Sequence, residues 1–213
     1  TENGIKFHFK DNAGLSPGLF LDQRNNRSWL RQNCKDKSVL NLFAYTCGFS
    51  LVAAFSGAKE VVSVDLSSNF LSWGKENFGL NKVSIENSEF FAQDVEVFLK
   101  GCLKRNRFFD LILCDPPSFG RRGKEIFQIE KNLKSILKYC WQILSPGGYL
   151  LVSTNYEKWS LEDLKRNLKD AIEKEALEES IFFPVNVMPG WDFELPNKDR
   201  LLKFTVVHRR PLR

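Results

Sequence analysis

The chain has 213 residues, of which 43% are hydrophobic and 27% charged, a balance typical of a globular protein. The 19 phenylalanines exclude a disordered chain. No stretch approaches the roughly 18–20 consecutive apolar residues that a membrane span needs, so an integral membrane protein is excluded. Lysine and arginine number 31 against 26 aspartate and glutamate residues, and the net charge of +5 is compatible with an anionic partner.

The five cysteines argue against both a disulfide framework and a metal cluster. Their number is odd and no two have CxxC spacing, so we expect no metal site and a reducing, cytoplasmic environment. The first ten residues, TENGIKFHFK, are not a signal peptide. Because the only methionine is Met188, the initiator is missing, either through processing or because the chain belongs to something longer.

Predicted helices and strands alternate along most of the chain, after an extended lead-in over residues 1–20 and a helix over 22–34. The predicted strands are 38–43, 60–65, 89–92, 108–114 and 149–154. The predicted helices between and after them are 51–55, 67–78, 94–103, 125–144 and 160–178, the last with a capping box formed by Ser160 and Asp163. An SPGG turn at 145–148 is expected to end the long helix, and two closing strands follow at 181–188 and 201–208.

This order of elements predicts an α/β fold. Alternating strands and helices favour a mostly parallel sheet of seven strands with helices on both faces, and the two closing strands favour an antiparallel hairpin at its C-terminal end. The sequence shows no repeat or flexible linker, so we predict one domain over residues 21–213. The lead-in over residues 1–20 would suit the remnant of an N-terminal domain.

The ends of the predicted strands hold the first candidate ligand contacts, because open α/β sheets bind ligands there. Asp65 ends the second strand, where an acid accepts hydrogen bonds from ribose hydroxyls, and Asp94 after the third could meet an adenine amino group. Each could instead be a helix-cap or turn acid. The loop after the first strand has a single glycine, Gly48, which favours a phosphate-free nucleoside over NAD.

The segment Asp115-Pro116-Pro117-Ser118-Phe119 after the fourth strand is the most specific motif. Its two prolines hold the chain extended and donate no hydrogen bonds, which leaves carbonyls as acceptors beside the Asp115 carboxylate. Phe119 follows at a distance suited to stacking on a planar base. The alternative is a rigid turn after a buried strand.

Together these residues resemble the class I S-adenosylmethionine-dependent methyltransferases, which have a Rossmann-like fold. The closer likeness is to the bacterial enzymes that methylate bases of large-subunit (23S) ribosomal RNA, the 5-methylcytosine and 7-methylguanine family. The resemblance implies S-adenosyl-L-methionine as cofactor and RNA as partner. The segments that carry it are GLFLDQRNNR (18–27), VLNLFAYTCGFS (39–50), VVSVDLS (61–67), NFGLN (77–81) and DPPSF (115–119).

The resemblance also implies roles for individual residues. The loop over residues 43–49 would wrap the methionine part of the cofactor, and Arg24 could pair with its carboxylate or be a solvated arginine at a helix start. The implied cofactor-binding residues are Arg24, Phe43, Tyr45, Thr46, Gly48, Asp65, Leu66, Asp94, Val95 and Asp115. The implied catalytic residues are Asp115, Pro116, Phe119 and Asn155, and the implied substrate-binding residues are Pro117, Ser118, Arg121 and Arg122.

The position of the cysteines bears on which atom is methylated. Methylation at C5 of cytosine needs a thiolate that first adds to C6, and 5-methylcytosine members of the family carry this cysteine after the fifth strand. Here that stretch is VSTNY (152–156), while Cys114 is expected to face away from Asp115 and Cys47 lies on the cofactor loop. We therefore predict methylation of a base nitrogen, as in the 7-methylguanine branch, by proximity and orientation.

Basic residues directly after DPPSF, namely Arg121, Arg122 and Lys124, are candidates for phosphates that flank a flipped base. The Glu-rich helix should face away from RNA. Relatives carry RNA-recognition domains before the catalytic one, so recognition is expected to be incomplete here. The alternatives are a methyltransferase acting on a small molecule or protein, and a non-catalytic cofactor- or RNA-binding module of a longer enzyme.

Overall fold

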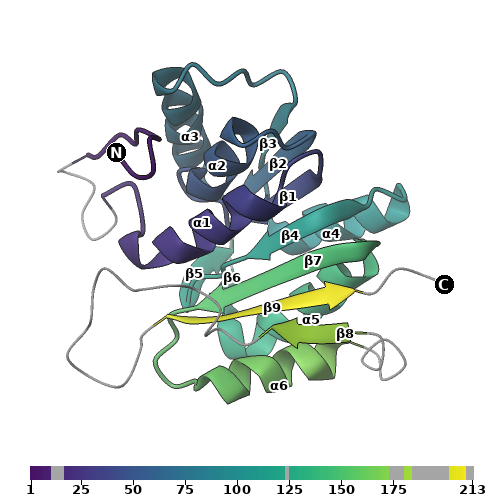
Figure 1. Ribbon diagram of the computed structural model, residues 1–213. Helices are drawn as coiled ribbons and strands as arrows, with labels where there is room; N and C mark the ends of the chain where they lie inside the picture. The colour runs from purple at the N-terminus through teal and green to yellow at the C-terminus, as the bar shows by residue number, and fades with distance from the viewer. Residues whose placement is uncertain (11–16, 123–124, 173–179, 184–201, 210–213) are drawn as a thin grey trace. The chain divides into compact units, whose positions relative to one another are not determined.

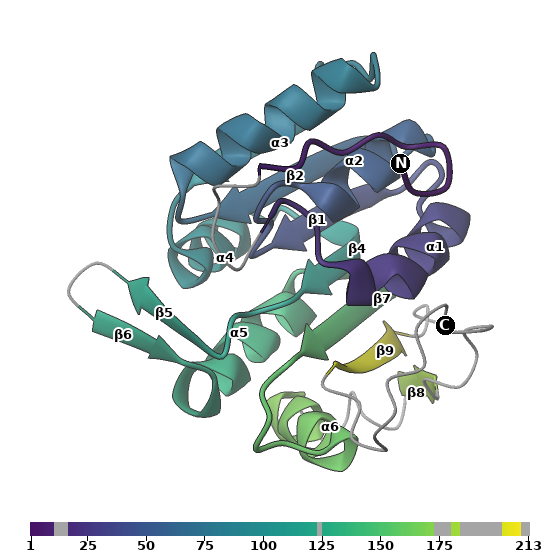
Figure 2. The same ribbon diagram turned by 90° about the vertical axis from the view of Figure 1, so that its left-hand side faces the viewer.

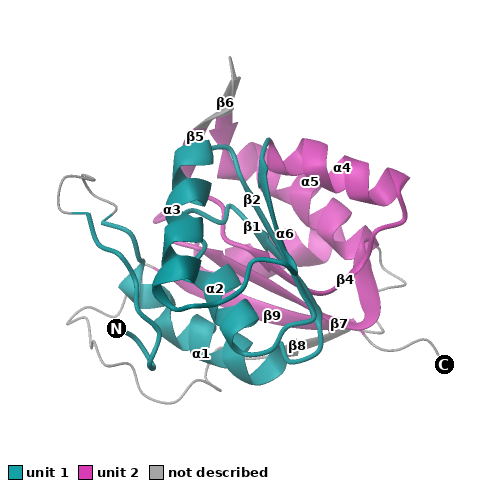
Figure 3. Cartoon of the chain, turned by 90° about the horizontal axis from the view of Figure 1, so that it is seen from above, with its two compact units in different colours: residues 1–93 teal, residues 94–213 magenta. Residues whose placement is uncertain are grey.

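The computed structural model describes residues 1–10, 17–122, 125–172, 180–183 and 202–209, and for 121–122, 125–126 and 180–183 it gives the backbone alone. The chain divides into two compact units, residues 1–93 and residues 94–213 (Figure 3). Among the described helices, none has both the length and the apolar character that crossing a membrane requires.

Unit 1 is built around three parallel strands in the order β3-β2-β1 (Figure 1). Strands β1 and β2 are mostly buried and apolar, apart from Asn41 and Ser63. The register pairs Leu42 with Val64 and Asp65 with Ala92, so these strand ends lie side by side. The elements of unit 1 are η1 (Leu21–Gln23), α1 (Arg24–Asn33), β1 (Ser38–Leu42), α2 (Gly48–Phe55), β2 (Glu60–Asp65), α3 (Ser68–Leu80) and β3 (Ser88–Ala92).

The described part of the lead-in packs in unit 1. Ile5, Phe7 and Leu19 are buried there. The Arg27 guanidinium on α1 donates to both carboxylate oxygens of Glu2, each at 2.7 Å, and this ion pair is buried. The lead-in therefore contributes to the core of unit 1 and is tied to α1.

Unit 2 has four strands in the order β4-β7-β9-β8. Strands β4 and β7 are parallel, and β9 is antiparallel to both β7 and β8. The elements are α4 (Val95–Lys104), β4 (Phe109–Cys114), β5 (Phe119–Arg122), β6 (Glu125–Gln128), α5 (Ile129–Gln142), β7 (Leu144–Thr154), α6 (Leu161–Ala171), β8 (Ser180–Phe183) and β9 (Lys203–Arg209).

The predicted α/β class, with parallel strands alternating with helices and an antiparallel pair at the C-terminus, is confirmed as a Rossmann-like fold. The capping box at the start of α6 is also confirmed, since Ser160 Oγ accepts from the Asp163 N–H and the Asp163 side chain accepts from the Ser160 N–H. The single domain over 21–213 stays a prediction.

The predicted helix over 125–144 is wrong at its N-terminal end. Residues 125–128 form β6, which pairs antiparallel with β5 directly after the DPP segment (Figure 2). The apolar positions that recur at helical spacing begin at Ile129, and from there the side chains of α5 are buried on one face. In the preceding residues, pairing with the β5 backbone replaces the helical hydrogen bonds.

The prediction that the SPGG turn ends the helix is wrong: α5 ends at Gln142, with Ile143 as its C-cap, and SPGG lies inside β7, which begins at Leu144. Leu144 pairs with Phe109 ahead of a register shift, after which Tyr149 pairs with Leu111. Three predictions fall partly outside the described residues: the helix beyond residue 172, the strand at 184–188 and the start of the last strand at 201.

Candidate functional site

The loop between β1 and α2 turns through three residues in the left-handed backbone region. Phe43, Tyr45 and Cys47 have φ angles of 56°, 49° and 59°, and none of them is glycine. Each such residue costs about 1 kcal/mol or more, so the loop needs its surroundings to hold it in shape. The sequence motif alone does not reveal this alternation.

Asp65 at the end of β2 is one of the groups that hold the loop. Its Oδ2 accepts a hydrogen bond from the Tyr45 N–H at 2.9 Å, and its Oδ1 accepts from the Ser67 N–H at 2.8 Å. The alternative role of this acid, in a turn, is therefore confirmed, and its contact with the ribose stays a prediction. Each oxygen can accept one further hydrogen bond, which leaves Asp65 able to meet a ligand hydroxyl. Burial raises the pKa of Asp65, and the two backbone hydrogen bonds partly offset that rise.

The other candidate cofactor residues of unit 1 fall into two groups. The side chain of Thr46 is buried and donates to the Gly18 carbonyl at 2.5 Å, while a Cβ at Gly48 would lie 3.0 Å from Leu19 Cδ1. These two residues thus face the lead-in. The side chains of Arg24, Phe43, Tyr45 and Leu66 are half-buried or exposed. Arg24 is the first residue of α1, and the Tyr45 ring lies among those of Phe20, Phe70 and Trp73.

In unit 2 the carboxylate of Asp115 is oriented by a neighbour on β7. Ser153, which is fully buried, donates from its hydroxyl to Asp115 Oδ1 at 2.6 Å. Because Cys114 pairs with Val152, the next residues, Asp115 and Ser153, lie together at the strand ends. Ser153 is a functional candidate that the motif analysis missed, although a serine inside an apolar strand is a visible signal.

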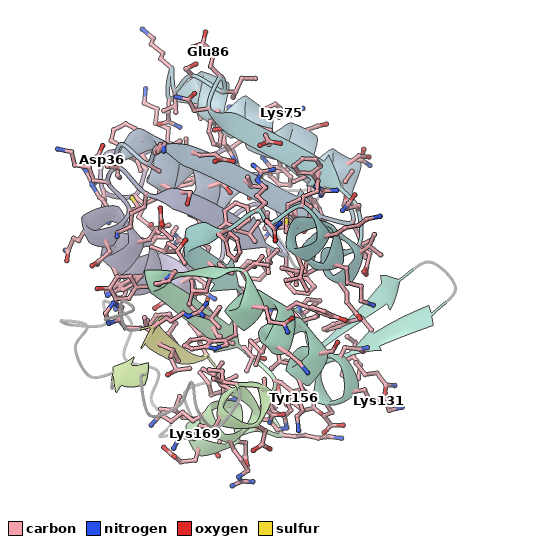
Figure 4. All side chains as sticks on the ribbon, turned by 90° about the vertical axis from the view of Figure 1, so that its right-hand side faces the viewer. Asp36, Lys75, Glu86, Lys131, Tyr156 and Lys169 are labelled. Carbon is pink, nitrogen blue, oxygen red and sulfur yellow. The ribbon has the colours of Figure 1, made fainter. Side chains whose placement is uncertain are left out.

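The rest of the DPPSF segment meets the end of β7. Ser118 Oγ donates to Asn155 Oδ1 at 3.1 Å, and the Phe119 ring, 63% exposed, stands edge-on to Tyr156 with centroids 6.2 Å apart. Tyr156, labelled in Figure 4, is buried and donates from its hydroxyl to Glu130 on α5 at 2.7 Å. Unit 2 thus brings a carboxylate, an amide and an exposed ring to one strand edge.

Pro116 is buried and Pro117 is exposed, as expected for a segment that turns out of a buried strand. Asp94 caps α4, where its Oδ1 accepts from the Val97 N–H at 3.0 Å, and Val95 is buried. The helix-cap alternative for Asp94 is therefore confirmed, and its contact with adenine stays a prediction. The backbone of Arg121 and Arg122 lies in β5, while their side chains and all of Lys124 fall outside the described residues.

Comparison with known proteins identifies the family. A family model described as S-adenosylmethionine-dependent methyltransferase matches residues 1–187. This chain belongs to that family. The ribosomal RNA large subunit methyltransferase K/L of Psychrobacter cryohalolentis is 34% identical over 215 residues, which cover 99% of this chain and 26% of the relative.

Two further methyltransferases are similar to the chain. The ribosomal RNA large subunit methyltransferase K of Neisseria meningitidis serogroup B is 39% identical over 166 residues, covering 77% of this chain and 47% of the relative. The crystal structure of SMU.776, a candidate methyltransferase in complex with SAH, superposes with a TM-score of 0.82 at 30% identity and covers 97% of this chain and 54% of that one. The chain thus spans about half or less of the curated relatives' length.

The residues of unit 1 fit the cofactor of this methyltransferase family. S-adenosyl-L-methionine carries ribose hydroxyls and no phosphate. Asp65 retains acceptor capacity for hydroxyls, and the adjoining loop has no glycine-rich cradle for phosphate. No group of three or more possible metal ligands is found in the part of the chain that the structure describes.

All five cysteines lie in described segments, and all are buried. Burial raises the pKa of the Cys47 thiol to about 12 and that of Cys34 to about 11. A hydrogen bond with Cys140, together with burial, raises the pKa of Cys114. Cys114 is fully buried, as predicted for the residue that faces away from the Asp115 side chain. In this methyltransferase Cys34, Cys47 and Cys114 are therefore protonated core residues at neutral pH.

Proposed function

We propose that this chain methylates a base nitrogen of RNA, as the catalytic part of a protein that acts on large-subunit ribosomal RNA. The relatives' names support the RNA substrate, and the observation that carries the proposal is the arrangement at the edge of unit 2. There the oriented carboxylate of Asp115 and the amide of Asn155 lie at the strand ends, and Phe119, from the same segment as Asp115, presents an exposed ring edge-on to Tyr156. A ring face for stacking and polar groups for a base edge are what a flipped base requires.

In this proposal S-adenosyl-L-methionine supplies the methyl group, and the chain supplies binding and orientation. Asp65 accepts hydrogen bonds from the ribose hydroxyls, and Asp115 with Asn155 holds the edge of the target base while Phe119 stacks on its face. A base nitrogen has its own lone pair, so the chain needs only to present it in line with the methyl group. Pro116 and Pro117 keep the segment extended.

Nitrogen rather than carbon is proposed as the target because no thiolate is at hand. The stretch Ser153-Thr154-Asn155 has no cysteine. All five cysteines are buried, and burial raises the thiol pKa of Cys34 and Cys47. A hydrogen bond with Cys140, together with burial, raises the pKa of Cys114 as well. A covalent attack on C6 of cytosine would need an accessible thiolate. A 7-methylguanine-like product fits this arrangement.

The remaining assignments are part of the same proposal. Arg24 would pair with the methionine carboxylate, Leu66, Asp94 and Val95 would border the adenosine, and Ser118, Arg121 and Arg122 would contact the RNA. We also propose that the catalytic domain covers residues 21–213, with the described part of the lead-in packed in its unit 1, and that it acts in the cytoplasm.

The test is transfer of a radiolabelled methyl group from S-adenosyl-L-methionine to ribosomal RNA from cells lacking the gene, followed by mass spectrometry of the nucleosides. We expect a methylated guanine, loss of transfer in Phe119→Ala, and retained transfer in Cys114→Ala. Transfer to small molecules or protein alone would overturn the RNA assignment. Absence of heat on titration with S-adenosyl-L-methionine would reduce the chain to a non-catalytic module, and loss of transfer in a folded Cys114→Ala variant would overturn the nitrogen assignment.

A further inference from the structure

The strained loop over residues 43–47 is held from behind by two other segments of unit 1. The helix α3 approaches so closely that a Cβ at Gly74 would lie 2.5 Å from Cys47 Sγ. On the other side, Thr46 donates its hydroxyl hydrogen bond to the Gly18 carbonyl. Gly18 itself has a φ of +124°, and a Cβ there would lie 2.6 Å from the His8 carbonyl oxygen, so only glycine fits.

Asn77 on α3 connects these segments. Its side chain is fully buried, and its Nδ2 donates to the Thr46 carbonyl at 3.2 Å while its Oδ1 accepts from the His8 N–H at 2.9 Å. The two partners fix the orientation of the amide, because a backbone carbonyl needs a donor and a backbone N–H needs an acceptor. One side chain thus joins the loop to the lead-in.

Asn81, the C-cap residue of α3, binds the lead-in without reaching the loop. Its Oδ1 accepts from the Lys6 N–H at 2.8 Å, and its Nδ2 donates to the Lys6 carbonyl at 2.7 Å. Both asparagines of the NFGLN motif therefore bind the backbone of the lead-in, and Asn77 also contacts the loop over residues 43–47. This difference makes Asn81 a matched control for Asn77.

We propose that Asn77 is a positioning residue for cofactor binding: with the lead-in, it holds the residue 43–47 loop in the left-handed conformation that receives S-adenosyl-L-methionine. The proposal rests on the assignment of that loop to the cofactor. If the loop is already ordered before the cofactor binds, the free energy of binding is not reduced by the entropic cost of ordering it. The loss of one hydrogen bond should therefore appear as weaker cofactor binding, by about fivefold to tenfold.

The test compares Asn77→Asp, Thr46→Val and Asn81→Ala in the full 213-residue chain. The readouts are S-adenosylhomocysteine affinity by calorimetry, amide hydrogen exchange of residues 43–48 and thermal unfolding. Asn77→Asp keeps the acceptor for His8 but faces the Thr46 carbonyl with a carboxylate. Thr46→Val removes only the bond to Gly18. We expect both to weaken binding and to speed exchange in the loop, whereas Asn81→Ala lowers stability alone.

A pH series separates positioning from general stability. Protonation of the carboxylate introduced by Asn77→Asp restores a donor toward the Thr46 carbonyl, so the affinity of this variant relative to wild type should recover as the pH falls. Wild-type affinity in folded Asn77→Asp and Thr46→Val, or an equal loss in Asn81→Ala, would overturn the proposal. Absence of wild-type binding would instead refute the cofactor site, and exchange of the loop amides would then decide the role of Asn77.

Discussion

At the scale of single residues, the site depends on partners that orient its acids. Asp65 is held by two backbone N–H groups and Asp115 by the Ser153 hydroxyl. A carboxylate with a fixed orientation meets its ligand without first losing rotational freedom. Removing the partner should therefore affect function more than folding.

The role of Ser153 is testable by removing its hydroxyl. We expect Ser153→Ala to lower the kcat of methyl transfer by about fivefold to tenfold, the effect of losing one hydrogen bond, with little change in cofactor affinity. The control is Thr205→Val on the neighbouring strand β9, because the buried Thr205 hydroxyl has no hydrogen-bond partner among the residues that the structure describes. Equal kcat values for wild type and Ser153→Ala would contradict the positioning of Asp115.

The raised pKa of Asp65 predicts that cofactor binding depends on pH. Burial raises its pKa above the ordinary 3.8, so it takes up a proton at a higher pH than an exposed aspartate does. As the pH falls from 7, S-adenosylhomocysteine affinity should decrease because the protonated acid loses acceptor capacity. The raised pKa also means that the folded state binds this proton more tightly than the unfolded chain does. Its contribution to stability therefore increases as the pH falls.

Titration calorimetry and thermal unfolding across pH 4–8 measure the two opposite trends. Asp65→Asn serves as the control, since its affinity should be low and nearly independent of pH. An affinity that declines with the same midpoint in Asp65→Asn would show that another group is responsible.

At the scale of elements, β5 of the β5–β6 pair begins at Phe119 and ends in two arginines, Arg121 and Arg122. We expect Arg121→Ala with Arg122→Ala to weaken RNA binding and to reduce the slope of log affinity against log salt by roughly 1.5–2, as for the loss of two phosphate contacts. Filter binding between low and moderate salt measures this slope.

The matched control for the arginine pair is Lys165→Ala with Arg166→Ala on α6. It removes the same charge, but these cations already pair with Glu162 and Asp163. If both double variants change the salt slope equally, the effect comes from net charge rather than from the β5–β6 pair.

At the scale of the whole molecule, the ion pair between Glu2 and Arg27 ties the start of the chain to unit 1. Both side chains are buried, and the guanidinium also donates to the Phe20 carbonyl at 2.9 Å. Arg27→Ala would leave a buried carboxylate without its partner, which costs about 3–5 kcal/mol. We expect a large fall in the free energy of unfolding, measured with denaturant, and a smaller one in Glu2→Gln. A loss below about 1 kcal/mol in Arg27→Ala would show that the lead-in is dispensable.

The fold class and most strand positions were predictable, because buried parallel strands are short apolar runs separated by helices at regular intervals. The error at residues 125–128 has a physical cause. A strand of four residues such as β6 is stabilised by backbone pairing with β5, and its sequence does not differ enough from the start of a helix.

The sequence by itself indicated the methyltransferase family through the resemblance of its motif segments, and local patterns placed acids at the strand ends. It also showed that the stretch 152–156, where the resemblance implies a cysteine in 5-methylcytosine enzymes, has none. The tertiary structure alone showed what holds the site. Gly18 and Asn77 support the loop at Thr46, and Ser153 orients Asp115. These hydrogen bonds join residues 28 to 38 positions apart. Such separations leave no pattern in the sequence, since they arise only when the strands and helices pack.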